Sequence, residues 1–332
     1  MQGNSIMVTG GAGYIGSHVV KLLGENNENI VVLDNLSKGF KEAVLYGELM
    51  VGNTGDKELV SKIMQHYNVD TVMHFAAHTI VPESVSNPLK YYGNNTCNTR
   101  NLLEVCQAHH VKHFIFSSTA AVYGMPTGET VSEESPLAPI NAYGTSKLMS
   151  EWMLRDLSNT SDMNHVSLRY FNVAGCDPDG KIGQSTPGAT LLTKVACETA
   201  VGKRQSISIY GTDYPTKDGT GIRDYIHVVD LADAHISALN YLRNGGDSIT
   251  LNCGYGHGYS VREVLDTVKR VSNVNLTIKE ENRRPGDPAT LVSQADKIGK
   301  ILDWKPKHDD LEFIVQTSYE WEKKLINGDG YE

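Results

Sequence analysis

Three glycines that follow the first buried strand constrain the fold more than any other feature of the sequence. The apolar run 6–9 predicts a strand, and Gly10, Gly13 and Gly16 lead from it into a helix that extends toward Leu23. In such a unit the first glycine permits a tight turn, the second lets the backbone approach a pyrophosphate, and the third lets the helix pack on the strand. Free N–H groups at the helix N-terminus favour negative charge. The loop therefore predicts a dinucleotide-binding site.

A carboxylate after the next strand indicates which dinucleotide is bound. The run 30–33 predicts this strand, and Asp34 follows it directly. A carboxylate in that place can accept hydrogen bonds from the adenosine ribose hydroxyls. A 2′-phosphate would meet like charge there and find no arginine among the next few residues, although Lys38 and Lys41 are close in sequence. We therefore expect NAD as the cofactor.

Short β-branched runs alternate with helix-length segments through the first half of the chain. Besides the two strands above, the runs 71–75, 114–117 and 166–169 predict strands. Apolar runs of this length between helices indicate a parallel sheet covered on both faces. We expect an α/β fold with a Rossmann-type, doubly wound parallel sheet in residues 1–172 and a smaller mixed α/β substrate-binding domain in residues 173–332.

The character of the sequence changes beyond Gly175. Loops rich in Gly, Pro and Asp come first, and mixed helix and strand follow. Apolar residues at helical spacing predict a final helix over 311–325. The segment at about 225–243 is expected to return to the first domain.

Composition and charge exclude several classes of protein. No apolar run approaches the roughly 18 residues of a membrane span, and the N-terminus lacks the basic and apolar segments of a secretory signal. We therefore expect a cytoplasmic protein without membrane contact. The formal net charge of −9 discourages nucleic-acid binding. Five widely spaced cysteines without a C-x-x-C pair argue against a disulfide framework and a zinc site, so no metal is expected, and most of these cysteines should be buried.

A tyrosine and a lysine four residues apart form a candidate catalytic pair. On a helix, Tyr143 and Lys147 would lie on the same face, one turn apart. A free tyrosine has a pKa of about 10, so a base near pH 7 needs its anion stabilised by the lysine and by a positively charged nicotinamide. Thr119 follows a strand whose carboxyl end should face the ligand. Its hydroxyl could instead only cap a turn.

These motifs together resemble the extended short-chain dehydrogenase/reductase family. Segments along nearly the whole chain are similar to the UDP-hexose 4-epimerases within it, and the most specific of them is 218–228; the others are 10–18, 34–36, 74–77 and 169–172. The resemblance implies reversible C4 epimerisation of a UDP-hexose, from UDP-galactose to UDP-glucose, through a 4-keto intermediate with tightly bound NAD. It also implies a homodimer formed by helices around 94–109 and 142–157.

The resemblance assigns a role to individual residues. It makes Tyr143 the base, Lys147 the group that lowers its pKa and holds the nicotinamide ribose, and Thr119 a proton shuttle. The residues that it places around NAD are Gly10, Gly13, Tyr14, Ile15, Gly16, Asp34, Asn35, Asn53, Thr54, Phe75, Ala76, Asn94, Tyr143, Lys147 and Phe171. Those that it places around the UDP-sugar are Thr119, Asn172, Leu192, Tyr210, Arg223, Arg284 and Asp287.

Several of these residues have simpler interpretations or depart from the family pattern. Without the family, Arg223–Asp224 could be a structural ion pair and Arg283–Arg284 a solvated basic turn, although two arginines suit a pyrophosphate well. Asn53 replaces the more usual aspartate near adenine, and Leu191 stands where a histidine or asparagine often reaches the phosphates. Leu291 occupies a position that can decide whether an N-acetyl group fits, which leaves UDP-N-acetylhexosamines open as substrates.

Other reactions remain alternatives. The enzyme could act mainly on UDP-GlcNAc or UDP-glucuronate. A nucleotide-sugar dehydratase needs a further acid and base, but Ala120 and Ala121 follow Thr119. Asp34 disfavours a reductase that uses NADPH. A nonenzymatic dinucleotide-binding regulator would have little use for the tyrosine–lysine pair.

Overall fold

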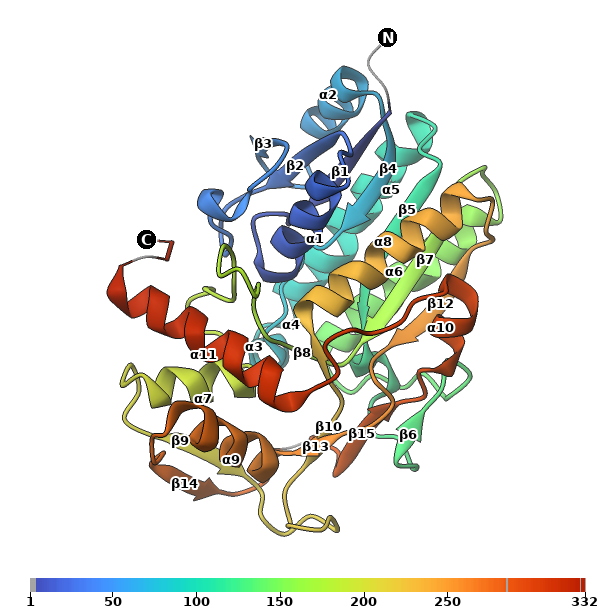
Figure 1. Cartoon of the computed structure of the whole chain (residues 1–332). Helices are drawn as coiled ribbons and strands as arrows, with labels where there is room; N and C mark the ends of the chain where they lie inside the picture. Colours follow the sequence, from blue (N-terminus) through green and yellow to red (C-terminus); the bar gives the residue numbers. More distant parts are fainter. Residues whose placement is uncertain (1–3, 285, 329, 332) are drawn as a thin grey trace.

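A seven-stranded parallel sheet forms the centre of the computed structural model, which describes residues 4–284, 286–328 and 330–331 (Figure 1). The strand order is β12-β7-β5-β4-β1-β2-β3. The strands are β1 (Ser5–Thr9), β2 (Ile30–Asp34), β3 (Glu48–Val51), β4 (Val69–His74), β5 (His113–Thr119), β7 (Asn164–Tyr170) and β12 (Ile249–Cys253). All five strands predicted from the sequence are confirmed. The strand order reverses between β1 and β4, and in such sheets a ligand binds at the carboxyl ends beside this point.

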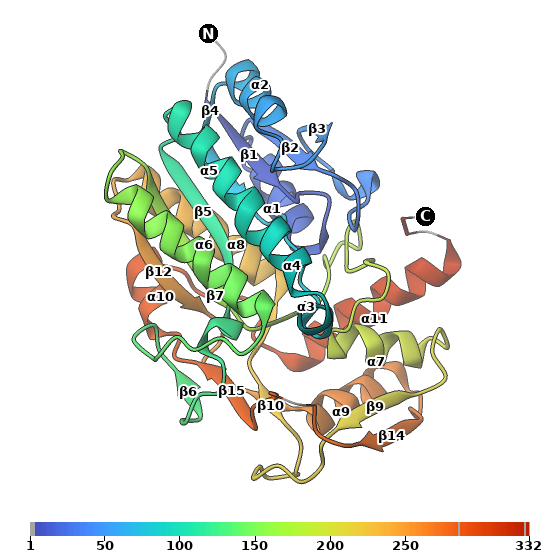
Figure 2. The same ribbon diagram turned by 180° about the vertical axis from the view of Figure 1, so that it is seen from behind.

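Helices cover both faces of the sheet because alternate strand residues point to opposite sides. Val8 and Val32 pack on one side, and Met7 and Val31 pack on the other. The first side carries α1 (Tyr14–Glu25), α8 (Val228–Arg243) and α10 (Asp296–Leu302). The second side carries α2 (Lys57–Tyr67), α5 (Asn98–Ala108) and α6 (Ala142–Ser158) (Figure 2). The doubly wound fold is therefore as expected.

A second, smaller core lies beyond the carboxyl ends of the main strands. It includes Cys197, Ile209, Val264 and Ile314. The elements around it are α7 (Leu192–Ala200), β9 (Ile207–Tyr210), α9 (Val261–Ser272), β14 (Ile278–Glu281) and α11 (Leu311–Asn327). The expected final helix is thus present as α11.

Short elements connect the two cores. A four-stranded sheet has the order β13-β10-β15-β6, and β8 pairs in parallel with β11. These strands are β6 (Thr130–Val131), β8 (Asn172–Ala174), β10 (Ile222–Arg223), β11 (Tyr225–His227), β13 (Tyr259–Ser260) and β15 (Thr290–Ser293). The short helical segments are η1 (Lys41–Ala43), α3 (Val81–Ser86), α4 (Pro88–Tyr91), the π-helical η2 (Tyr92–Cys97) and η3 (Ala120–Tyr123).

Two general properties of the chain bear on its function. Among the described residues, no helix is both long and apolar enough to cross a membrane. All five cysteines are free, and four of them are buried, as expected; Cys97 is exposed.

Candidate active site

The glycine loop lies where β1 turns into α1, at the carboxyl edge of the main sheet. Gly10 has a φ of +71°, and a Cβ added there would lie 2.6 Å from the backbone nitrogen of Ala76. A Cβ added at Gly16 would overlap the carbonyl oxygen of Gly10. Only a glycine therefore fits either position. Tyr14 and Ile15 begin α1, and Gly13 at its N-cap supplies no side chain, which leaves N–H groups of the first turn free for an anion.

A cleft opens in front of this loop. Nine of the residues expected around NAD line it, namely Gly10, Gly13, Asp34, Asn35, Asn53, Thr54, Phe75, Ala76 and Asn94. They follow the carboxyl ends of β1, β2, β3 and β4, with Asn94 contributed by η2. The cleft also contains Lys38 and His78, which no motif had marked. Their signal was only that each follows a predicted strand end by a few residues.

Asp34 is held in place by backbone donors. Its carboxylate accepts hydrogen bonds from the N–H groups of Ala12 at 3.0 Å and Leu36 at 2.8 Å. Burial raises the pKa of this carboxyl group, and the two N–H bonds oppose the rise. A carboxylate has about four lone-pair sites, so acceptor capacity remains for ribose hydroxyls.

Asn53 retains the acceptor that an aspartate would provide. Its Oδ1 atom accepts from the N–H of Gly55 at 2.7 Å and from Nδ2 of Asn98 at 3.0 Å. An amide oxygen can make both bonds, which explains why this departure from the family pattern is compatible with the loop.

Tyr143 and Lys147 lie in the first turns of α6. Asn141 caps this helix and accepts a hydrogen bond from the N–H of Gly144 at 2.9 Å. The Nζ atom of Lys147 donates to the carbonyl oxygen of Ser117 at 2.7 Å and lies 4.9 Å from the ring centre of Phe116. Because Ser117 belongs to β5, this bond fixes the lysine at the carboxyl edge of the sheet.

Thr119 ends β5 and caps the short helical segment that follows it. Its hydroxyl caps η3 by accepting a hydrogen bond from the N–H of Ala121 at 3.2 Å. Its interaction with Tyr143 also acts to lower the pKa of that tyrosine. Capping a turn and contacting the candidate base are therefore compatible.

Burial sets the protonation of the tyrosine–lysine pair. It raises the pKa of Tyr143 and lowers the pKa of Lys147 to about 7. The phenol is thus favoured over the phenolate when the protein's own groups act alone. A positive charge placed beside Tyr143 would lower its pKa, in agreement with the expectation that both the lysine and a cationic nicotinamide are needed.

The residues expected to hold the sugar nucleotide come from the second half of the chain. Arg223 in β10 forms an ion pair with Asp287 and donates to the carbonyl oxygen of Pro288 at 2.7 Å. The guanidinium group of Arg284 lies 3.8 Å from the ring centre of Tyr210, at the end of β9. The structure thus brings four of the predicted residues into two pairs.

Of the two simpler interpretations of the arginines, the Arg223–Asp224 ion pair is wrong and the solvated turn agrees with the exposure of Arg283 and Arg284. Asp224 does not pair with Arg223, because its buried carboxylate accepts from Tyr255, Gly256 and Ser293. Arg283 and Arg284 are both exposed, as a solvated basic turn predicts, and the Nε atom of Arg283 donates to Asp213 at 2.6 Å.

The remaining predicted residues lie at the starts of β8 and α7 and between β7 and β8. Asn172 begins β8, and its N–H donates to the carbonyl oxygen of Asp224 at 3.0 Å. Leu192 begins α7, whose N-cap Leu191 supplies no capping hydrogen bond. Phe171 and Leu291 pack against the same small apolar cluster, which contains Ala120 and Leu148.

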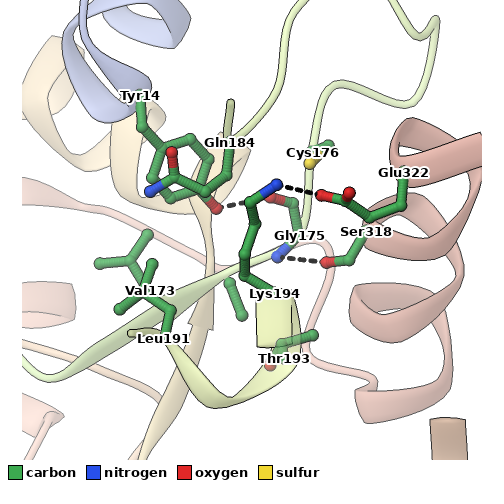
Figure 3. Close-up of a pocket in the computed structure, with 11 residues that line it drawn as sticks. Tyr14, Val173, Gly175, Cys176, Gln184, Leu191, Thr193, Lys194, Ser318 and Glu322 are labelled. Carbon is green, nitrogen blue, oxygen red and sulfur yellow. Dashed lines mark hydrogen bonds and ion pairs between the residues drawn. The ribbon is translucent and has the colours of Figure 1, made fainter. Parts of the chain in front are cut away.

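A small cavity lies between Tyr14, at the start of α1, and the helices α7 and α11 of the second core (Figure 3). The hydroxyl of Tyr14 donates to the carbonyl oxygen of Gly175. The N–H of Gly175 in turn donates to the hydroxyl of Ser318 in α11 at 3.1 Å. Lys194 of α7 forms a buried ion pair with Glu322 of α11 on the opposite wall. The side chain of Leu191 lines this cavity. A contact from Leu191 to a phosphate would therefore require its backbone.

A dinucleotide cleft beside a buried tyrosine–lysine pair, on a doubly wound sheet, defines an enzyme of the short-chain dehydrogenase/reductase type. The model of the NAD dependent epimerase/dehydratase family matches residues 6–254, and the chain belongs to this family. It is 52% identical to the UDP-glucose 4-epimerase of Azospirillum brasilense over 96% of this chain and 92% of that protein.

Solved structures agree with this assignment. The chain is 38% identical to the UDP-glucose 4-epimerase from Brucella ovis, solved in complex with NAD, with a TM-score of 0.94 over 99% of both chains. It is 50% identical to the UDP-Glc/GlcNAc 4-epimerase from Campylobacter jejuni, with a TM-score of 0.86 over 97% of this chain and 100% of that chain.

Proposed function

We propose that this chain catalyses the reversible C4 epimerisation of a UDP-hexose, UDP-galactose to UDP-glucose, with NAD held as a resident cofactor. The observation that carries this proposal is the buried Tyr143–Lys147 pair, fixed to β5 at the same sheet edge as the dinucleotide cleft. Relatives named as UDP-glucose 4-epimerases match along almost the whole chain. The fit of the cleft to NAD rests on the side-chain-free N-terminus of α1 and the acceptor capacity of Asp34.

The proton of the reaction passes through the tyrosine. Tyr143, directly or through the hydroxyl of Thr119, accepts the proton of the sugar 4-hydroxyl and later returns it. Bound NAD supplies the acceptor and donor of the C4 hydride, so the 4-hydroxyl becomes a ketone and is then reduced again. The ammonium group of Lys147 stabilises the tyrosinate during this exchange.

Inversion at C4 requires the hexose to turn over while the nucleotide stays bound. Arg223 and Arg284 would hold the diphosphate, and Tyr210 would lie beside it. Charge-assisted contacts from two arginines are strong and directional, whereas the hexose itself has few such partners among the proposed residues. The sugar can therefore swing about the pyrophosphate and present its other face to the same Tyr143.

The division of the chain follows from this function. We assign residues 1–172, with the return at 225–243, to NAD binding and the rest of 173–332 to binding of the sugar nucleotide. The packing of α8 against α1 supports the return. Because β12 pairs with β7, the returning segment would extend to residue 253.

We also propose that the enzyme is a homodimer that works in the cytoplasm. Free thiols, which are typical of reducing compartments, support the cytoplasmic location.

The dimer is supported by large apolar side chains that are exposed on adjoining helices, namely Val85 in α3, which is 67% exposed, and Trp152 in α6, which is 46% exposed. The helices α3 to α6 share one side of the molecule (Figure 2), which suits a two-fold interface. Light scattering after gel filtration should give twice the chain mass, and Trp152→Glu should give monomers; a monomeric native protein would contradict the proposal.

The direct test of the activity uses purified protein without added cofactor. Separate incubation with UDP-glucose, UDP-GlcNAc and UDP-glucuronate, followed by separation of the products, should give the 4-epimer of UDP-glucose. The Tyr143→Phe protein, prepared in parallel, controls for contaminating epimerase. Turnover of UDP-GlcNAc would extend the substrate range, as the name of the C. jejuni relative suggests. If no sugar is epimerised, the proposed function is wrong.

A further inference from the structure

A buried carboxylate lies one helical turn beyond the lysine of the candidate catalytic pair. Tyr143, Lys147 and Glu151 are spaced four apart in α6 and share one face of the helix. Glu151 is 5% exposed, and nothing in the mechanism above uses it. Buried carboxylates are rare unless they are paired, so the partners of this one indicate its role.

Both oxygens of Glu151 are fully engaged. Arg169 donates from Nε to Oε1 at 2.9 Å and from Nη2 to Oε2 at 2.6 Å, a two-pronged contact. The hydroxyl of Ser118 donates to Oε1 as well. Arg169 is held on its other side by the hydroxyl of Tyr123 at 3.0 Å, which in turn donates to Asn252 at 2.6 Å.

These bonds join α6 to β5 and β7, the two strands whose carboxyl ends lie beside the candidate catalytic pair. Ser118 lies between Ser117, whose carbonyl oxygen accepts from Lys147, and Thr119, which contacts Tyr143. Arg169 precedes Tyr170 in β7, and the hydroxyl of Tyr170 forms a hydrogen bond with the hydroxyl of Ser117. Glu151 therefore fixes the end of β5 to α6 and β7.

The charge of Glu151 also acts on the lysine. Its negative charge raises the pKa of Lys147 and opposes the effect of burial. The titratable and charged groups around this lysine and its carboxylate are Tyr143 and Glu151 in α6, His74 in β4, Tyr123 in η3, and Arg169 and Tyr170 in β7. Burial holds His74 neutral, with a pKa of about 3. Glu151 is thus the anion that offsets two buried cations.

We propose that Glu151 is a positioning residue for the proton transfer: its carboxylate holds the end of β5 against α6 and supplies the negative charge that retains the Lys147 ammonium beside Tyr143. This inference rests on the proposed function and adds to it a residue that does not touch the substrate. Loss of the charge should slow the proton transfer. Binding of the nucleotide by Arg223 and Arg284 should stay unchanged.

The test replaces the charge and retains the shape. In Glu151→Gln, Lys147 should lose its proton at lower pH, because the anion that favours its charged form is gone. The alkaline limb of the profile of kcat against pH should therefore move down by about one pH unit, which is a tenfold loss of kcat on that limb. The KM for UDP-glucose should change less than about threefold.

Two companion variants separate charge from structure. Glu151→Asp keeps the charge and should keep the alkaline limb in place. Asp230→Asn removes another buried carboxylate, which accepts from Tyr255 at 2.7 Å and from the N–H of His308 at 2.8 Å. Because Asp230 shares no hydrogen-bond partner with Glu151 or Lys147 among the described residues, this variant should lower the Tm and leave the pH limbs unchanged.

Folding could be affected because Glu151→Gln leaves the Arg169 cation unpaired, which is costly in a protein interior. The double variant Glu151→Gln/Arg169→Met removes both charges and should fold, with an alkaline limb still below that of the native protein. NMR titration of labelled lysine gives the pKa of Lys147 without turnover, so the inference is testable even if the proposed reaction is wrong. The role of Glu151 would be wrong if the alkaline limb and the pKa of Lys147 stayed unchanged in Glu151→Gln and in Glu151→Gln/Arg169→Met. If Tyr143→Phe were inactive in the same assays, the proposed reaction itself would still stand.

Discussion

The dinucleotide side and the sugar-nucleotide side of this site are built in different ways. On the first side, the cleft is formed by residues that directly follow four neighbouring parallel strands, and the glycine loop presents mainly backbone. On the second side, side chains from separate short elements meet: Tyr210 ends β9, Arg223 lies in β10, and Asp287 lies in the loop before β15. The first arrangement depends on local sequence, and the second depends on the tertiary fold.

This difference determines where relatives can diverge. A backbone cradle tolerates few changes, because a Cβ at Gly10 or Gly16 has no room. A cluster of side chains can change one residue at a time. Leu191 and Leu291, the two departures that bear on phosphate and sugar, both lie on this second side.

Acid should destabilise both sides and give the largest effect, because buried histidines lie on both: His227 of β11, whose pKa burial lowers to about 3, bonds to Thr317 of α11 in the second core. Burial lowers the pKa of His18 and His235 to about 4 and that of His74 to about 3. An unfolded histidine titrates near 6.5, so the unfolded chain binds more protons between these values. Stability is therefore complete above about pH 6.5 and falls by about 1.4 kcal/mol per pH unit for each such histidine as the pH decreases. Several together approach the whole stability of a typical domain.

The measurement is the release of NAD and the loss of circular dichroism between pH 7.5 and 4. His235→Leu should move the acid midpoint to lower pH, because it removes one buried histidine that is neutral in the folded protein. A Tm that stays constant down to pH 4.5 would contradict the destabilising effect of these buried histidines.

Replacement of the candidate base should give the next largest effect. Tyr143→Phe keeps the ring and removes only the hydroxyl that contacts Thr119. We expect kcat to fall by about 10²–10⁴-fold, as is typical of a positioned acid or base, with little change in NAD content. Steady-state assays of UDP-galactose conversion, with absorbance of the bound cofactor as the folding control, measure both quantities. Near-normal turnover would remove Tyr143 from the mechanism.

The same difference explains what could be predicted from the sequence. The five predicted strands are apolar runs that are buried at most positions, so their pattern is visible locally. By contrast, β3 is a half-exposed edge strand with the burial of a loop, and β12 joins the sheet beside β7 only through long-range pairing. Neither strand has a local sequence pattern that distinguishes it from a loop.

The candidate site follows the same division. The glycine loop and Asp34 were predicted from spacing alone, since strand, turn and helix occupy consecutive residues. The contacts of Arg223 were not, because its partner Asp287 is 64 residues away in the chain while the adjacent Asp224 binds backbone N–H groups. Glu151 was missed because its partners Arg169 and Ser118 lie on two strands.

Arg223 allows a test of the side-chain cluster. Arg223→Leu should raise the KM for UDP-glucose by about 10–100-fold, since each hydrogen bond to a charged group contributes about 1.5–3 kcal/mol, with a smaller effect on kcat. Arg283→Leu is the matched control, because Arg283 is also paired with an aspartate, Asp213, but is exposed and is not among the residues expected around the diphosphate. Equal effects of the two variants on KM would mean that the diphosphate does not bind at Arg223.

Asp34 allows the corresponding test on the dinucleotide side, where the backbone carries more of the binding and a single side chain should matter less. Asp34→Asn keeps one acceptor oxygen but turns an NH₂ group toward a donor, either the N–H of Ala12 or that of Leu36. We expect about a tenfold weaker affinity for NAD, from the loss of one charge-assisted bond. The preference for NAD over NADP should narrow, because the negative charge opposite a 2′-phosphate is gone. Calorimetric titration of cofactor-free protein with both dinucleotides measures these changes; a loss as large as that at Arg223 would show that the two sides depend equally on single side chains.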